Sequence, residues 1–229
     1  RTQITWPGTP TFDVTYAYDA TGAVTTIKEN GTTSLATYAY DDYGRRTSIT
    51  RGNGVTTTYN YDSSTRLSSL VQDLSSTPND QTLSYSYNAS NQILTRTGSN
   101  SAYTWPQPSP GYANYATNGL NQYPSVGGTT FSYDTRGNLT SNGTTTYAYD
   151  AYNRMKSAGT ATLSYDPASR LYQTAGAATT RFLYDGQNAI AEYDGSNALQ
   201  RRFVFGPGID EPIVWYEGSG TTDRRYLIA

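Results

Sequence analysis

One short sequence unit recurs along the chain and limits what the chain can fold into. The unit is an aromatic residue, a small residue, a tyrosine and an aspartate, as in Tyr147-Ala148-Tyr149-Asp150. Two variable residues follow, and then a Gly, Asn or Ser, as at Asn153. The last tyrosines of four such units lie at positions 133, 149, 165 and 184, in steps of 16, 16 and 19 residues. Repetition at a short period is typical of a repeat architecture.

Each unit predicts one β-hairpin. Alternating large and small residues fit a strand with one packed face, so Tyr147 and Tyr149 are expected on one face and Ala148 on the other. An aspartate at the strand end accepts hydrogen bonds from backbone N–H groups two residues on and opens a turn. Asn153 stands where such a turn needs a left-handed residue, and Met155 begins the return strand. Because a lone hairpin is not stable in water, the hairpins must stack side by side.

Eight units of this form are present, and the first four are spaced by 22, 21 and 26 residues, with Asn88 in place of the aspartate in the fourth. Their tyrosines, aspartates and turn residues are the structural site that the sequence predicts. The residues are Tyr16, Tyr18, Asp19, Gly22, Tyr38, Tyr40, Asp41, Gly44, Tyr59, Tyr61, Asp62, Tyr85, Tyr87, Tyr133, Asp134, Gly137, Tyr147, Tyr149, Asp150, Asn153, Tyr165, Asp166, Tyr184 and Asp185.

Composition supports an all-β fold of stacked hairpins in one continuing sheet. The chain has 229 residues, 23 Tyr and 21 Gly, and its net charge is only −2, so a sheet is favoured over a disordered coil despite an apolar fraction of 35%. It has no Cys and no His, which excludes disulfides, thiolate metal sites and histidine-based catalysis. No apolar run is long enough for a transmembrane helix. The dispersed, nearly neutral charge argues against nucleic acid as a partner. No cofactor or metal site is predicted.

The spacing of the units divides the chain into three parts. Residues 1–98 hold four hairpin units, residues 99–126 form a Pro/Tyr-rich insertion, and residues 127–229 hold the remaining units and a different C-terminal part. Three prolines at 106, 108 and 110 rule out a central strand there. The insertion is interpreted as a long surface excursion, or alternatively as a segment that folds over the inner sheet face or closes an edge.

These motifs resemble the Rhs family, also called YD-repeat proteins. Besides the eight units, the passage Asn-Gly-Leu-Asn-Gln-Tyr at 118–123 before 131–140 looks like a characteristic family passage. So do residues 184–193 continuing to 201–206, and Asp-Glu-Pro at 210–212. The resemblance covers almost the whole chain.

The resemblance implies a fold and a role. In bacterial toxin systems of this family the repeats spiral into a hollow β-shell that encloses a variable C-terminal toxin, often released by self-cleavage at catalytic aspartates. Relatives on animal cell surfaces use a similar shell in adhesion. No Asp-Pro cleavage motif follows Trp215, and Asp166-Pro167 lies inside a repeat and is not taken as a cleavage site. The chain is therefore interpreted as a fragment of a larger protein.

The candidate site residues have a structural and a functional interpretation. The tyrosines are expected to pack on the sheet, ring upon ring on equivalent strands, although exposed rings also suit sugars or unfolded polypeptide. The repeated aspartates indicate turn chemistry rather than catalysis. The arginines that follow the turns are expected to pair with aspartates of neighbouring units. Asp210 and Glu211 are adjacent acids, but neighbouring strand residues point to opposite faces, which disfavours a shared catalytic role.

Three functions are consistent with the sequence, and an enzyme is the least favoured class. The first is a structural section of a bacterial Rhs-type shell that encloses and helps to deliver a C-terminal toxin. Its partners would be the parent chain's own toxin domain and neighbouring repeats. The second is a secreted or cell-surface protein for carbohydrate binding or adhesion. The third is an extracellular fibre subunit joined edge to edge. All three place the protein outside the cell or at its surface.

Overall fold

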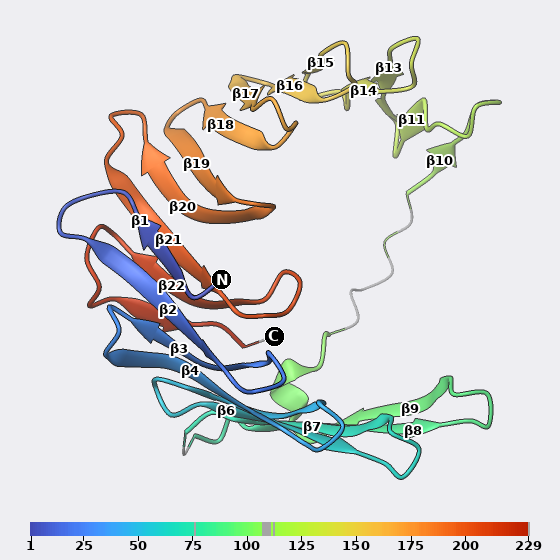
Figure 1. The fold of residues 1–229 in the computed structure, drawn as a ribbon. Coiled ribbons are helices and arrows are strands. Elements are labelled where there is room, and N and C mark those ends of the chain that lie inside the picture. The colour runs from blue at the N-terminus through green and yellow to red at the C-terminus, as the bar shows by residue number, and fades with distance from the viewer. Residues whose placement is uncertain (76, 107–110, 112, 229) are drawn as a thin grey trace. The chain divides into compact units, whose positions relative to one another are not determined.

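The computed structural model describes residues 1–75, 77–106, 111 and 113–228. Two nine-stranded antiparallel sheets dominate it, and each follows sequence order from one edge to the other (Figure 1). The first sheet consists of β1 (Gln3–Trp6), β2 (Phe12–Tyr18), β3 (Val24–Glu29), β4 (Thr33–Tyr40), β5 (Arg46–Arg51), β6 (Thr56–Tyr61), β7 (Leu67–Asp73), β8 (Gln81–Tyr87) and β9 (Ile93–Gly98).

Smaller elements come between the two sheets in sequence. A 3-10 turn, η1 (Ser101–Tyr103), follows β9. Three two-residue strands form a small sheet, and two more strands form a lone hairpin. These strands are β10 (Tyr115–Ala116), β11 (Ser125–Val126), β12 (Thr129–Thr130), β13 (Ser132–Tyr133) and β14 (Leu139–Ser141). Part of the expected 99–126 insertion, residues 107–110 and 112, lies outside the described residues.

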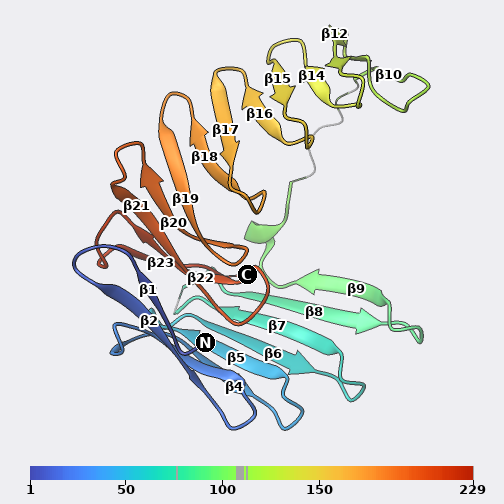
Figure 2. The same cartoon turned by 45° about the horizontal axis from the view of Figure 1, so that its top comes forward.

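The second nine-stranded sheet runs to the C-terminal end of the chain, and its first hairpins can be followed in Figure 2. Its strands are β15 (Tyr147–Tyr149), β16 (Met155–Ala158), β17 (Ala161–Tyr165), β18 (Leu171–Ala175), β19 (Thr179–Asp185), β20 (Asn188–Asp194), β21 (Leu199–Phe205), β22 (Pro212–Glu217) and β23 (Arg224–Tyr226). The prediction of an all-β fold built from stacked antiparallel hairpins is confirmed. Within the described residues, no helix has the length and apolarity needed to cross a bilayer.

The chain divides into two compact units. One contains Arg1–Pro106 together with Phe203–Ala229, and the other contains Gln107–Arg202. Most of the buried apolar side chains belong to the first unit, whereas Ile190 and Ala191 are the two that belong to the second. The hydrophobic core of the protein is therefore concentrated in the first unit.

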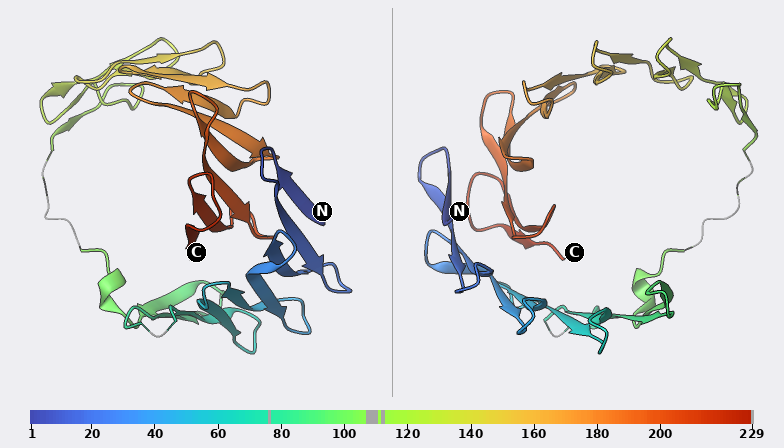
Figure 3. Two further views of the ribbon diagram at one scale, coloured as in Figure 1. Left: turned by 90° about the vertical axis from the view of Figure 1, so that its left-hand side faces the viewer. Right: turned by 45° about the vertical axis from the view of Figure 1, so that its right-hand side comes forward.

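That core lies between the first sheet and the C-terminal strands, as can be followed in Figure 3. Val14, Ile27 and Ile49 on the sheet are at most 1% exposed, and so are Ile213 and Tyr216 on β22. The rings of Phe12 and Tyr216 meet edge to face, with centroids 5.2 Å apart. We call the face of the first sheet that carries Val14, Ile27 and Ile49 the inner face. Chain segments nearly 200 residues apart in sequence thus bury each other's apolar surface.

Polar contacts fix the C-terminal strands on the inner face. Glu29, only 4% exposed, accepts a hydrogen bond from the Tyr216 hydroxyl at 2.7 Å. The same carboxylate accepts two from the Arg224 guanidinium, at 2.8 and 2.9 Å. Arg46 binds Glu211 with two nitrogens, at 2.5 and 3.2 Å. A buried charge is stable only when it is paired in this way.

The Tyr216 hydroxyl gives the first test. We expect Tyr216→Phe to lower the free energy of unfolding by about 1–3 kcal/mol, because the buried Glu29 carboxylate loses a donor that water cannot replace. Urea titration followed by tryptophan fluorescence measures this. The matched control is Tyr172→Phe, since Tyr172 is 46% exposed. Equal stability of the two variants would show that the Tyr216 hydroxyl contributes nothing to the closure of this core.

Candidate functional site

The candidate site is the turn that ends each Tyr-x-Tyr-Asp strand, and the Asp41 turn shows its geometry. The Asp41 Oδ1 accepts the backbone N–H of Tyr43 at 3.0 Å and that of Arg45 at 2.9 Å. The Asp41 N–H donates to the Arg45 carbonyl, and the Gly44 N–H donates to the Asp41 carbonyl, both at 2.9 Å. Gly44 has φ +73°, in the left-handed region. This is a three-residue hairpin loop whose left-handed residue forms a β-bulge.

The bulge limits the expected alternation of the strand. In the hairpin of Asp41 the pairing register shifts between Ala39 and Tyr40, and the hairpin of Asp150 shifts in the same way between Ala148 and Tyr149. Strict alternation therefore stops one residue before the last tyrosine. The reason is one unpaired residue on the return strand, Thr47 in the Asp41 hairpin and Lys156 in the Asp150 hairpin, which lies three residues past the left-handed turn residue.

The same turn occurs at nine places in the described chain, and the acidic or amide residue that opens it accepts backbone N–H groups at each. These residues are Asp19, Asp41, Asp62, Asn88, Asn118, Asp134, Asp150, Asp166 and Asp194. The third residue after each has positive φ: Gly22, Gly44, Thr65, Asn91, Asn121, Gly137, Asn153, Ser169 and Asn197. Gly22, Gly44, Gly137 and Asn153 thus occupy the turn position at which the sequence placed them.

Two of these turns were not recognised as units from the sequence, and one recognised unit lacks the turn. Asn118 and Asp194 open full turns although Thr117 replaces the last tyrosine before the first and Ala191 replaces the leading aromatic residue before the second. The sequence does contain the turn pattern at both places, because Asn121 and Asn197 lie three residues later, where a left-handed residue is needed. The prediction for Asp185 is wrong: it is the last residue of β19 and pairs with Asn188 across a two-residue turn. Gly186 follows it directly, one or two residues too early for the longer loop.

The last tyrosine of each unit joins its hairpin to the preceding one. The Tyr61 hydroxyl donates to the Arg46 carbonyl at 2.9 Å, and the Tyr87 hydroxyl donates to the Leu67 carbonyl at 2.7 Å. Except for Tyr18, which has no turn before it, the acceptor is the fifth residue after the Asp or Asn that opens the preceding turn. The further pairs are Tyr18 to Arg1, Tyr40 to Val24, Tyr133 to Tyr123, Tyr149 to Leu139, Tyr165 to Met155 and Tyr184 to Leu171. We call this series the tyrosine ladder.

The arginines that follow the turns bind differently from the expectation. Each pairs with the aspartate of its own turn, as Arg66 does with Asp62 at 2.8 Å, and not with the aspartate of a neighbouring unit. The Arg66 guanidinium then lies over the ring of the next unit, 4.7 Å from the Tyr87 centroid. Arg45 over Tyr61, Arg154 over Tyr165 and Arg170 over Tyr184 repeat this contact. Cations, rather than a second tyrosine ring, therefore cover these ring faces.

Two turns replace the charged pair with a neutral one of the same shape. The Asn88 Nδ2 donates to the Gln92 Oε1 at 2.8 Å, and Asn118 and Gln122 make the same bond. Both members of the pair change together, so the side-chain hydrogen bond across the turn is kept. This indicates that the hydrogen-bond pattern matters more to the turn than the charge.

The turn hydrogen bonds shift the pKa of the aspartates. The Arg45 side chain is the main cause that lowers the pKa of Asp41 below its usual value. The backbone N–H of the arginine four residues on is the main cause for Asp62 and Asp166. Hydrogen bonds to the charged carboxylate stabilise it against protonation. These carboxylates are held ionised as structural acceptors.

Of the adjacent acids Asp210 and Glu211, Glu211 has structural partners. Glu211 lies just before β22, where its Oε2 accepts the Gly208 N–H at 2.8 Å while the carboxylate binds Arg46. Asp210 lies in the preceding turn, with φ +49°. Within the described residues, no group of three or more Asp or Glu side chains is arranged to hold a metal ion.

A cleft of about 500 Å³ opens between two successive turns of the second unit. Its walls are Tyr152, Arg154, Tyr165, Asp166, Pro167 and Ser169. The Arg154 guanidinium there is already bound to Asp150 at 2.7 Å and to the Ser169 hydroxyl at 3.1 Å. The polar groups of this cleft therefore serve the turns and not a ligand.

The fold and the turns define a class of protein: a tandem array of β-hairpins joined by the tyrosine ladder. Comparison with known families gives a match to the RHS Repeat model over residues 18–56 and 40–76, which hold the second and third units. Residues 18–76 are therefore of the RHS-repeat type, and the same turn recurs as far as Asp194. The comparison with curated proteins found no match.

Solved structures with some likeness to the chain carry toxin names. One is a chain of the Photorhabdus luminescens Tc holotoxin pore, with 15% identity and a TM-score of 0.40, covering 92% of this chain and 14% of that one. Another is the crystal structure of TcdB2-TccC3, with 14% identity and a TM-score of 0.39, covering 95% and 16%. The chain thus spans about one-seventh of the length of these proteins.

The tyrosine ladder predicts the effect of removing one hydroxyl. Tyr87→Phe keeps the ring under Arg66 and removes only the hydrogen bond to the Leu67 carbonyl. We expect the free energy of unfolding to fall by about 1 kcal/mol. Tyr43→Phe is the control, because Tyr43 stands at a turn tip and is 80% exposed. If chemical denaturation gives the same midpoint for both variants, the hydroxyls do not hold the hairpins together.

The lowered aspartate pKa values predict how stability depends on pH. The unfolded state binds protons first, near pH 3.9, so the contribution of these groups is complete above that pH and is lost as pH falls through the lower folded pKa. With no histidine to titrate, stability should be flat between about pH 5 and pH 8 and fall below about pH 4. Thermal unfolding followed across this pH range measures how stability depends on pH. Asp62→Asn with Arg66→Gln, which copies the neutral pair, should weaken the acid dependence; an unchanged dependence would argue against the assignment.

Proposed function

We propose that this RHS-repeat section is part of the wall of a shell that encloses a C-terminal toxin of its parent protein. The observation that supports this best is the tyrosine ladder. It links successive hairpins by the same bond, in the first sheet and again from Tyr133 to Tyr184. A sheet of this kind extends by adding units, which suits a wall.

The proposal includes a passive chemical role. The turn carboxylates accept backbone N–H groups in every copy, and Glu211 is bound to Arg46, so these acids serve structure and not a reaction. We therefore propose that this section is not an enzyme. Delivery of a toxin also requires that the parent protein act outside the cytoplasm, secreted or at the bacterial surface.

The test uses the full-length parent protein. We expect a polypeptide that continues past residue 229 and ends in a domain that resists added protease while the repeats are folded. Mass spectrometry of limited digests, with and without urea, measures that protection. The separately expressed C-terminal domain is the control. A C-terminal domain that is cut equally fast in both forms, or a parent that continues only as repeats, would exclude enclosure.

A further inference from the structure

Strand β9 is the last strand of the first sheet and has only one partner. It pairs with β8 along one edge, and all six of its residues are exposed. Figure 2 shows it at the open end of the run that begins with β1. The Ser99 N–H donates to the Thr82 carbonyl, so by antiparallel alternation the backbone of Gly98 and Arg96 is directed to the other edge. An unpaired edge of this kind can accept another strand.

The pairing between the other hairpins of this chain predicts which positions of a docked strand would face β9. Positions are counted here from the Asp or Asn that opens each turn. At five junctions between hairpins, the eighth residue after it pairs with the residue that lies four before the last tyrosine of the next unit. The pairs are Ile27 with Ala36, Ile49 with Thr57, Leu70 with Leu83, Ala158 with Ala161, and Thr174 with Thr180. The tyrosine hydroxyl then reaches the carbonyl five positions after the turn residue. For the Asn88 turn these positions are Arg96 and Ile93.

The next unit of the chain lacks the residue that this position needs. It reads Tyr115-Ala116-Thr117-Asn118, with Thr117 in place of the last tyrosine. Its strand β10 pairs instead with β11 in the small separate sheet. The change from Tyr to Thr removes the hydroxyl that would reach the Ile93 carbonyl. This explains why the ladder is interrupted after β9.

Arg96 places a positive charge at this edge, which favours an acidic residue on the docked strand. It lies on the inner face directly opposite Tyr85, and it has no hydrogen bond or ion pair with any described residue. The turn arginines, by contrast, are bound to carboxylates. No unit of this chain has an acid four residues before its last tyrosine. Those positions are Val14, Ala36, Thr57, Leu83, Thr129, Thr145, Ala161 and Thr180.

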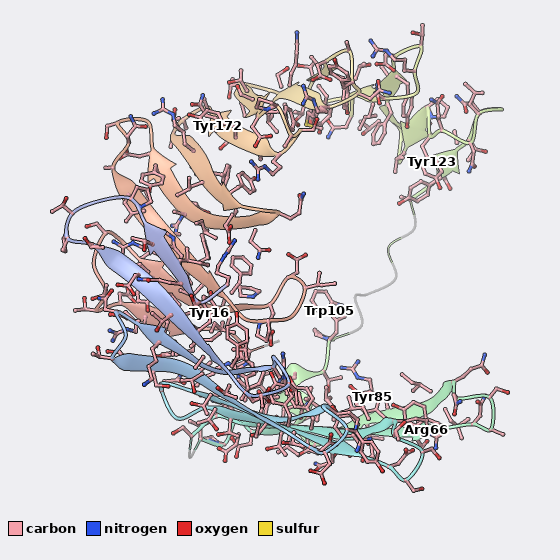
Figure 4. The ribbon with its side chains drawn as sticks, in the orientation of Figure 1. Tyr16, Arg66, Tyr85, Trp105, Tyr123 and Tyr172 are labelled. Carbon is pink, nitrogen blue, oxygen red and sulfur yellow. The ribbon has the colours of Figure 1, made fainter. Side chains whose placement is uncertain are left out.

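A cleft beside Arg96 favours a large apolar residue on the docked strand. It has a volume of about 320 Å³ and is lined by residues of β8, β9 and the segment 100–105, among them Leu83, Gly98, Tyr103 and Trp105. Trp105 is 83% exposed, and Figure 4 shows it on the segment that leaves η1. Gly98 lies two residues beyond Arg96, so the facing position on a docked strand is six before its tyrosine. A large apolar side chain there would cover Trp105.

We propose that the free edge of β9 binds an extended polypeptide segment from outside these 229 residues by strand addition. The segment carries an apolar residue, an acid and a tyrosine at positions −6, −4 and 0. The acid pairs with Arg96, the apolar side chain enters the Trp105 cleft, and the tyrosine hydroxyl donates to the Ile93 carbonyl. The inference does not depend on the enclosure of a toxin.

The probe is a peptide made from the chain's own β8. It copies residues 79–90 with Gln81→Phe and Leu83→Glu, so that Tyr87 supplies position 0. The control peptide keeps Leu83 and carries Ser84→Glu, which places the acid on the opposite face. Fluorescence anisotropy of labelled peptides on the whole chain gives the affinities. We expect the first peptide to bind about three- to fivefold more tightly, the size of one cross-strand charge pair.

Two variants of the chain test separately the charge of Arg96 and the backbone hydrogen bonds at the free edge of β9. Arg96→Gln should lower the affinity of the first peptide to that of the control and leave the control unchanged. Gly98→Pro removes a backbone donor at the open edge and should abolish binding of both, with thermal unfolding of the variant as the check on its fold. The emission of Trp105 should shift on binding and not in Trp105→Phe. Absence of binding, or an equal effect of Arg96→Gln on both peptides, would overturn the proposal.

Discussion

The hydrogen bond from a tyrosine hydroxyl to a carbonyl of the preceding hairpin is the contact on which the repeat depends. In the hairpin of Tyr61 one residue of the return strand, Ser68, is left unpaired, and this bulge lies beside the tyrosine that makes the bond. The turn aspartate fixes the adjoining left-handed turn by accepting two backbone N–H groups. The arginine that binds this aspartate then covers the next unit's tyrosine ring. One short motif thus links turn, strand and neighbouring hairpin.

The turns and the core stabilise different parts of the protein. In the second unit few side chains are buried, so its hairpins depend chiefly on backbone pairing and on the bonds of the turns and the tyrosine ladder. The first unit has in addition a hydrophobic core between the sheet and β22. Buried apolar area there contributes most of the free energy available to the fold. Glu29 and Arg46 hold that core in one register through charged, fully partnered contacts.

The inner face changes character along the first sheet. Near β3 to β5 it is covered by the C-terminal strands, and Ile27, Ala36 and Ile49 are buried. At β8 and β9 the same face is open, and Arg96 and Trp105 are exposed there. The repeat therefore provides one surface with two uses. One part closes the fold, and the other is free to bind.

The sequence by itself determined the hairpins, their order and most of the turns. The reason is that a two-residue strand period, an aspartate and a left-handed Gly or Asn three residues later are local signals, and antiparallel neighbours in sequence are neighbours in the sheet. The turn at Asn118 was overlooked because the tyrosine pattern was weighted above the turn pattern. Asp185 was misjudged because Gly186 follows it too closely.

Only the tertiary structure decided which partner each side chain takes. Arg66 binds Asp62 in its own turn because the bulge brings residues four apart together, and the tyrosine period does not reveal this. The contacts of Glu29 with Tyr216 and of Arg46 with Glu211 join positions at least 165 residues apart. No local pattern encodes such pairs, because they depend on how β22 folds onto the sheet. The hairpins follow from short-range chemistry, whereas the core follows from packing between distant segments.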